Sequence, residues 1–431
     1  MRQPILNSQF SILNFPESLV PHTHMLPNGN ELCYFPNDAL ELVKLDITLE
    51  AGSRYQPLKS LAHVANRLVG EATVEHDEQQ VAEFLDFRGI VVERTTDVCI
   101  GTHSFYFLRR YAADLFPLIL EMYEAPSVSQ SMFSACVAHR RQQLATGFQK
   151  TSFVARNEYY QLLYGAEHPL GVYATPTDVD ALTIDSVADF IHQRYDLANA
   201  HLVLSGSVDD ELLALADRYL SPVKRKSVPE PLLPPPAPTV GAYHRVGAYS
   251  RVSPHDSQSE KVQSTIRIGR VLPMSWDTPD YARFMVLNTV LGGYFGSRLM
   301  SNIREEKGYT YGIYSMTQIH RGSIVFSIIA DVAAEAAQLA VEEVFKEMWQ
   351  LQQEPVSEEE LERVRHYMMG DFIRSIDGVF EVSERYIHMA STLVTEQLTT
   401  NLLDAIATVT PHQLQTLAQT TFTDLVTVVV N

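Results

Sequence analysis

A proline-rich run near the middle of the chain is the strongest constraint on its fold. Residues 222–240 contain seven prolines. Proline fixes the backbone φ angle and lacks the amide hydrogen that helix interiors and central strands need, so neither element can cross this run. The run predicts an extended, semi-rigid linker between two domains, because polyproline-II segments keep their length. A long surface loop within one domain is the alternative.

The size and charge of the chain limit its partners. Its 431 residues are enough for two or three domains. It carries 52 acidic and 33 basic side chains, which gives a formal net charge of −19. This field repels phosphate and anionic lipid, so we expect neither non-specific nucleic-acid binding nor membrane binding.

The cysteines and the N-terminal residues predict a cytoplasmic protein. Cys33, Cys99 and Cys136 are widely spaced and form no CxxC pair, which is typical of thiols in a reducing compartment. The first 15 residues lack the continuous apolar run of a signal peptide. Nowhere does the sequence approach the roughly 18 apolar residues of a membrane-spanning helix.

Hydrophobic periodicity predicts α+β structure in both halves of the chain. Ser357 and Glu360 form a capping-box pattern that marks one helix start. The strands are expected at 41–52, 89–96, 98–108, 200–206, 263–271, 309–317, 322–330 and 425–430. The helices are expected at 58–70, 110–124, 129–147, 151–164, 183–195, 208–220, 278–291, 297–306, 333–352 and 357–390. The similar order predicts a duplicated architecture with domains at 1–221 and 246–431, joined by a linker at 222–245.

One string in the second half points to a family. LGGYFGSRLMSNIREEKGYTYGIYS, residues 291–315, resembles the signature of the pitrilysin/insulinase family of zinc peptidases (peptidase family M16), with six residues between Arg304 and Tyr311. Residues 51–73, 159–183 and 190–208 resemble further blocks of that family. The resemblance implies two homologous α/β-sandwich domains, of the LuxS and mitochondrial-processing-peptidase type, that enclose a peptide in a cleft.

Active members of this family carry a His-x-x-Glu-His motif on a helix of the first half. Two imidazoles four residues apart lie on one helix face and can both bind zinc, while the carboxylate takes a proton from zinc-bound water. The matching stretch here retains only His63. Asn66 replaces the general base, and an amide cannot accept that proton. Arg67 replaces the second imidazole, and its guanidinium has no lone pair and repels a cation.

The third zinc ligand of the family is also missing. The resemblance places a distal glutamate in the helix after residue 133, but residues 139–150 contain no acidic side chain. Gln143 and Thr146 are the nearest candidates, and both are poor zinc ligands. We therefore expect no metal and no other cofactor in this chain. Elsewhere, Glu71, Glu75, His76 and Glu78 read as a solvated acidic helix start, and His22 and His24 as adventitious surface histidines.

Arg304 and Tyr311 are the active-site residues of the resembling family that this sequence keeps. In the resembling family, these two residues contact the substrate and the oxyanion of the transition state. Some bacterial members divide the work between two short chains, of which one carries the zinc motif and the other only the Arg/Tyr pair. This chain is similar to the second kind. The resemblance implies a heterodimer with a homologous, zinc-binding His-x-x-Glu-His subunit and a peptide substrate, and it leaves a homodimer open.

Two other functions remain open from the sequence. A structural or peptide-holding scaffold would need no chemistry, but it has no reason to keep Arg304 and Tyr311 at the catalytic spacing. An autonomous zinc peptidase with unrecognised ligands would contain stoichiometric zinc as the isolated chain.

Overall fold

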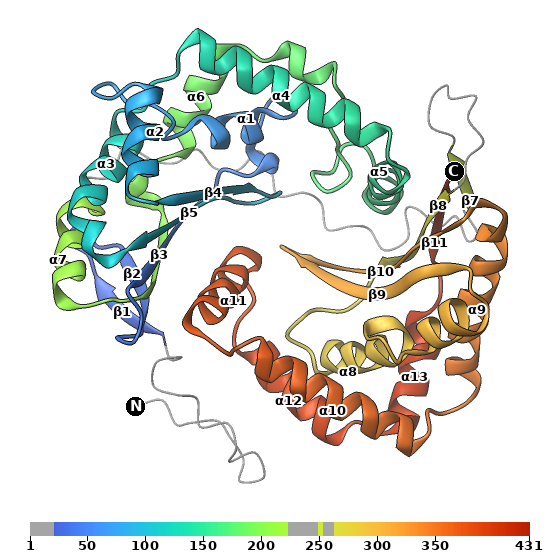
Figure 1. The fold of residues 1–431 in the computed structure, drawn as a ribbon. Coiled ribbons are helices and arrows are strands. Elements are labelled where there is room, and N and C mark those ends of the chain that lie inside the picture. Colours follow the sequence, from blue (N-terminus) through green and yellow to red (C-terminus); the bar gives the residue numbers. More distant parts are fainter. Residues whose placement is uncertain (1–20, 223–248, 253–262) are drawn as a thin grey trace. The chain divides into compact units, whose positions relative to one another are not determined.

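The computed structural model describes residues 21–222, 249–252 and 263–431 (Figure 1). The predicted linker at 222–245 therefore lies outside the described residues, apart from Pro222 at its start. The described chain forms two compact units. Unit 1 is the described part of Met1–Leu144, Ala174–Pro234 and Ser375–Ser391, and unit 2 is that of Ala145–Tyr173, Pro235–Arg374 and Thr392–Asn431.

Strands and helices alternate along the chain, and each unit contains one sheet. The strands are β1 His22–Met25, β2 Glu31–Pro36, β3 Leu42–Leu49, β4 Val91–Thr96, β5 Gly101–Leu108, β6 His201–Gly206, β7 Tyr249–Val252, β8 Gln263–Val271, β9 Thr310–His320, β10 Ser323–Ala333 and β11 Val426–Val430. The α-helices are α1 Leu61–Leu68, α2 Glu78–Phe87, α3 Ala112–Glu124, α4 Gln130–Phe148, α5 Thr151–Tyr164, α6 Ile184–Arg194, α7 Asp210–Tyr219, α8 Pro279–Asn288, α9 Ala337–Gln353, α10 Glu358–Arg374, α11 Val379–Thr392, α12 Gln397–Thr408 and α13 Pro411–Thr421. Two π-helical segments, η6 Thr289–Gly293 and η7 Met300–Glu306, follow α8.

The two sheets share a strand order. The sheet of unit 1 runs β1-β2-β6-β3-β5-β4, and that of unit 2 runs β7-β11-β8-β10-β9. In both sheets the pair that joins β2 to β6, or β7 to β11, is parallel, and the pairs that follow it toward β4 or β9 are antiparallel. The predicted α+β fold with two sheets is confirmed.

The units do not follow the two halves of the chain. Helix α5 precedes the predicted linker but packs on β8 and β11 of unit 2. Helix α11 follows the linker but belongs to unit 1. The predicted domain bounds were contiguous, whereas each unit includes a segment of the other half. The reason is burial: β3 and β11 are buried along nearly their whole length, so each sheet needs cover on both faces.

Helix α5 covers one face of the second sheet. Its buried residues form an apolar cluster with strands β10 and β11, including Val154, Val325 and Val428. At the centre of this contact, the Tyr159 hydroxyl donates a hydrogen bond to the Phe326 carbonyl oxygen at 2.6 Å. Gly269 on β8 allows this approach, because a Cβ built there would overlap both groups.

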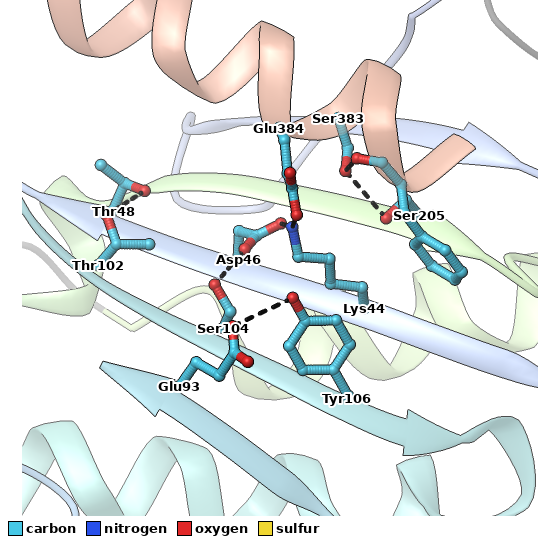
Figure 2. A network of polar contacts seen from close by, with 11 residues as sticks. Lys44, Asp46, Thr48, Glu93, Thr102, Ser104, Tyr106, Ser205, Ser383 and Glu384 are labelled. Carbon is cyan, nitrogen blue, oxygen red and sulfur yellow. Dashed lines mark hydrogen bonds and ion pairs between the residues drawn. The ribbon is translucent and has the colours of Figure 1, made fainter. Parts of the chain in front are cut away.

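Helix α11 covers one face of the first sheet with a mixed apolar and polar contact (Figure 2). Lys44 and Asp46 on β3 are buried, with only 2% and 1% of their surfaces exposed. Lys44 Nζ lies 3.3 Å from Asp46 Oδ2 and 3.3 Å from Glu384 Oε1 of α11. Burial opposes the charge on Lys44, but the two carboxylates outweigh it and raise its pKa. A buried cation with these partners therefore ties α11 to the sheet.

Several elements differ from the prediction. A single helix over 357–390 is wrong: α10 ends at Arg374 and α11 begins at Val379, because the chain passes there from unit 2 to unit 1. The Ser357 hydroxyl accepts from the Glu360 amide at 3.2 Å, as the capping pattern predicts, but the Glu360 carboxylate binds Arg298 instead. Strands β1 and β2 and helices α12 and α13 were not predicted.

No helix among the described residues combines the length and the apolar character that crossing a membrane requires.

We predict that Gly269→Ala destabilises the protein, because the added methyl group must displace backbone of β10 or the Tyr159 hydroxyl of α5. The expected loss is about 1–3 kcal/mol of unfolding free energy, measured by denaturant unfolding followed by circular dichroism. Gly370→Ala in α10 is the matched control, since its Cβ meets no atom within 4 Å. That change should be neutral or stabilising by about 0.5–1 kcal/mol. Equal midpoints for the two variants would contradict the close approach of α5.

Candidate functional site

Helix α1 carries the positions of the degenerate zinc motif. Its apolar side packs toward β4 and β5, and it is fastened there through a backbone group. His103 Nε2 on β5 donates to the Asn66 carbonyl oxygen at 3.0 Å, so its Nδ1 accepts from the Tyr123 hydroxyl at 2.6 Å. Burial, together with the nearby charge of Arg94, lowers the pKa of His103 to about 3. The ring therefore stays neutral, as this hydrogen-bond pattern requires.

His63 still has a ring nitrogen that could bind a metal, but positively charged side chains lie near it. It is partly buried on α1. Burial lowers its pKa to about 4, and the positive charges of Arg140, His139 and Arg67 contribute. The imidazole is thus neutral near pH 7 and still has a lone pair.

Asn66 faces inward and cannot act as a base. Only 2% of its surface is exposed. Its Nδ2 atom and the Tyr195 hydroxyl converge above Gly101, where a built Cβ would lie 2.8 Å from each. The Asn66 amide offsets part of the rise that burial causes in the pKa of Tyr195. Neither Asn66 Nδ2 nor the Tyr195 hydroxyl, however, makes a hydrogen bond of ordinary geometry. The amide therefore presents a buried donor where the family has a carboxylate.

Arg67 points outward and is part of an ion-pair cluster that the sequence prediction missed. Its Nη1 atom lies 2.9 Å from Glu71 Oε1, and Arg94 Nη1 lies 3.1 Å from the same oxygen. Glu71 is thus shared by two guanidinium groups and stands apart from the predicted solvated acidic face. Glu75, His76 and Glu78 are exposed at the start of α2, as predicted, and His76 lies 3.0 Å from Glu121. The i,i+4 spacing of Arg67 and Glu71 was the one visible signal.

Two histidines near the N-terminus contact neighbouring elements. His22 stacks on Tyr34 across β1 and β2, with ring centroids 5.1 Å apart. His24 Nε2 lies 2.7 Å from Asp217 Oδ1 of α7. Both are partly exposed, as expected of surface histidines, and their contacts hold β1 to β2 and α7.

The residues at the motif do not fit a zinc ion. Gln143, on the helix predicted to supply the distal ligand, is exposed, and its Nε2 atom lies 2.8 Å from His139 Nε2. Across residues 21–222, 249–252 and 263–431, no three His, Cys, Asp or Glu side chains are grouped so that they could hold a metal. Of the three motif positions only His63 carries an imidazole, and Arg67 and Arg140 place positive charge near it.

Arg304 and Tyr311 lie at an exposed end of unit 2. Arg304 is on η7, with its guanidinium carbon 4.6 Å from the centre of the Phe295 ring. Tyr311, near the start of β9, is 99% exposed. Segment η7 packs against β9, so both residues come from neighbouring elements. Tyr311 is thus accessible, whereas Arg304 is half-buried, and neither makes an ion pair within the described part of the chain.

Arg298, the other arginine of the string at 291–315, holds its segment in place. Arg298 binds Glu360 of α10 with two hydrogen bonds of 2.8 Å each. Asn302 donates to Glu343 and Glu347 of α9 at 2.9 and 2.6 Å. These contacts fasten the segment that carries Arg304, which leaves Arg304 itself available. The motif positions of α1 belong to unit 1, and the Arg304/Tyr311 pair to unit 2.

Comparison with known proteins links the chain to one family. The family model described as "Peptidase M16 inactive domain" matches residues 181–368. The "Uncharacterized zinc protease YmxG" of Bacillus subtilis is 19% identical over 81% of this chain and 83% of that protein. The "Non-peptidase homolog YmxG" of Helicobacter pylori is 23% identical over 72% of this chain and 69% of that protein.

A solved structure shares the fold. "The crystal structure of a protease from Helicobacter pylori" superposes with a TM-score of 0.82, covering 96% of this chain and 99% of that chain, at 16% sequence identity. At this identity the likeness speaks for the fold alone.

We predict that His63 makes the protein less stable in acid. Its pKa is about 4 in the fold against about 6.5 in the unfolded chain, so the unfolded state binds more protons between these values. Stability should therefore fall as the pH drops from about 6.5 to about 4. Replacing His63 by Gln should flatten this dependence by up to about 1.4 kcal/mol per pH unit, measured by urea unfolding at several pH values. Parallel curves for both proteins would refute the low pKa.

We also predict that restoring two motif positions does not restore a zinc site. The double variant Asn66→Glu, Arg67→His regains the base and the second imidazole but still has Gln143 in place of an acidic ligand. After incubation with zinc and desalting, elemental analysis should find well below one ion per chain. The triple variant with Gln143→Glu tests whether that helix supplies the third ligand. Stoichiometric zinc in the double variant would contradict the assignment.

Proposed function

The chain belongs to the M16 peptidase family, of the inactive-domain type, and from this premise we propose that it is the zinc-less subunit of a heteromeric metallopeptidase. Its partner is a homologous chain with an intact His-x-x-Glu-His motif, which carries the zinc ion. This chain contributes a wall of the peptide-binding cleft and the contacts of Arg304 and Tyr311. The protein is not an active peptidase by itself.

One observation carries the proposal. Unit 1 has an amide and an ion-paired guanidinium where the base and the second imidazole belong, while unit 2 retains a half-buried Arg304 and a fully exposed Tyr311. Loss of one set of catalytic groups together with retention of the other is expected of a subunit whose partner supplies what is missing.

The two retained groups suit the transition state of peptide hydrolysis. When water attacks the peptide carbonyl, negative charge develops on its oxygen. A phenolic hydroxyl can donate one hydrogen bond to that oxygen, and a guanidinium can donate two in parallel to a carbonyl or carboxylate of the substrate. The near-complete exposure of Tyr311 leaves its hydroxyl open to a bound peptide.

The architecture and compartment belong to the same proposal. The strand order common to both sheets supports a duplicated unit joined by the proline-rich residues 222–245. Cys33, Cys99 and Cys136 are free thiols, which suits a reducing compartment such as the cytoplasm. The proposal also includes a zinc ion on the partner and a peptide as the substrate. It includes no nucleic-acid partner.

A structural or peptide-holding scaffold is the second candidate. The H. pylori relative named as a non-peptidase homolog favours it. On this alternative, Arg304 and Tyr311 would make no contribution to any reaction, so the two functions differ in what these residues do.

We predict that Arg304→Ala and Tyr311→Phe lower peptide turnover by the reconstituted complex by roughly 10- to 1,000-fold, the range for losing an oxyanion donor. The chain is mixed with its homologous His-x-x-Glu-His subunit, and cleavage of a quenched fluorescent peptide is followed. Each subunit alone should be inactive or much slower than the mixture.

Tyr314→Phe is the matched control, because Tyr314 lies on the same strand, is 50% exposed and undergoes the same chemical change. It should leave turnover unchanged. Complex formation is measured separately by analytical ultracentrifugation. An intact complex whose rate is the same with all three variants would support the scaffold and overturn the catalytic role.

A further inference from the structure

Helix α9 of unit 2 carries an apolar stripe on its exposed side. Leu339, Phe345 and Trp349 are each between 40% and 58% exposed. Glu342 and Lys346 lie between them and are exposed as well. Positions 339, 342, 346 and 349 are three or four residues apart, so they follow one side of the helix. Large apolar side chains gathered on one exposed face are typical of an interaction surface.

The stripe borders a groove with an apolar wall. The groove has a volume of about 540 Å³ and lies between α9 and Phe422, the residue that follows α13. Gln352 Nε2 of α9 donates a hydrogen bond to the Phe422 carbonyl oxygen at 3.1 Å, which fixes this wall. Its apolar lining consists of Phe345, Met348, Trp349 and Phe422. A hollow of this size beside Trp349 can receive an apolar side chain from another molecule.

Two copies of α9 complement each other when they run antiparallel. With residue 344 of each copy at a two-fold axis, position 339 of one copy faces position 349 of the other, and 342 faces 346. Leu339 then meets Trp349 at the mouth of the groove, and Glu342 meets Lys346. Because a two-fold interface is self-complementary, the axis repeats each contact. The stripe therefore supplies two apolar contacts and two ion pairs to a second copy of itself.

We propose that the chain forms a homodimer in which two copies of α9 pack antiparallel across a two-fold axis. A second copy is the occupant that the charges select, because it presents Lys346 opposite Glu342, and Leu339 opposite the groove, by symmetry alone. The homodimer is separate from the heteromeric peptidase proposed above and uses neither Arg304 nor Tyr311.

The two ion pairs can form at little cost. Within one copy, Lys346 Nζ lies 3.2 Å from Glu343 Oε2, and Glu342 accepts a hydrogen bond from Gln338 at 3.0 Å. Exposed contacts of this kind are worth little, so both side chains can turn to a partner. The net charge of −19 on each copy opposes association. At about 0.15 M salt the Debye length is about 8 Å, which screens most of that repulsion but less of a contact buried at the axis.

The first test is the mass of the isolated full-length chain, measured by sedimentation velocity at increasing protein concentration in about 0.15 M salt. One helix pair buries less surface than a standard interface of about 1,600 Å², so the dimer should be weak and its fraction should rise with concentration. Trp349→Glu should weaken self-association at least about tenfold, because a buried tryptophan is a typical hot spot. Phe87→Glu is the matched control, since Phe87 is also an exposed aromatic residue on a helix, and this variant should dimerise as the wild type does.

An exchange of charges tests the register. In a homodimer, Glu342→Lys places lysine opposite Lys346 twice, and Lys346→Glu places glutamate opposite Glu342 twice. Each variant alone should therefore associate at least about tenfold more weakly than the wild type. Mixed in equal amounts, the two should form a heterodimer, because two lysines of one copy then face two glutamates of the other. Mixing leaves every contact within a chain unchanged, so this gain requires pairing between chains. Circular dichroism checks that each variant is folded.

A wild-type chain that stays monomeric at all concentrations, a dimer that Trp349→Glu leaves intact, or single charge variants that fail to associate when mixed would overturn the proposal. A monomeric wild type whose complex with the homologous His-x-x-Glu-His subunit is lost on Trp349→Glu would assign the groove to that subunit instead. The mass measurements on the isolated chain involve neither zinc nor peptide cleavage. Their failure therefore leaves the role of Arg304 and Tyr311 untouched, and loss of that role leaves the homodimer untouched.

Discussion

The architecture depends on one constraint: the central strands of both sheets are buried on both faces, so each sheet needs a helix layer on one side and a further helix on the other. Helix α5 meets this need for the second sheet and α11 for the first, and each comes from the other half of the sequence. A chain arranged this way cannot be cut at its proline-rich run into two self-sufficient pieces, because either piece would lack the cover for one face of its sheet.

Helix α1 shows why chemistry can be lost here without loss of fold. The hydrogen bond from His103 reaches the backbone carbonyl of Asn66 and not its side chain. This bond to the helix therefore survives a change of side chain at position 66. Arg67 faces outward, where it forms an ion pair with Glu71. A scaffold bond that runs through the backbone outlasts the exchange of a base for an amide, although the Asn66 amide is itself left as a buried donor without an acceptor.

The sequence predicted the α+β class and most long helices, because these follow from hydrophobic periodicity. It did not predict the break between α10 and α11, since that break serves contacts in the other unit and leaves little local signal. Helix α13 had a local signal that was overlooked, a capping box from Thr410 to Gln413 with proline at the first position. The sharing of Glu71 by Arg67 and Arg94 joins positions 23 residues apart, a separation that carries no periodic pattern.

The direction of the substitutions at the motif is itself informative. A site that merely decays can accept any residue that keeps the helix, and a small or neutral side chain would avoid electrostatic cost. Here the new residue is an arginine, placed near Arg140 and Arg94 with one carboxylate, Glu71, shared between it and Arg94. Like charges held close together cost free energy unless an anion offsets them. In this structure Glu71 is the anion that offsets both Arg67 and Arg94, so the replaced motif position has become part of the contact between α1 and β4.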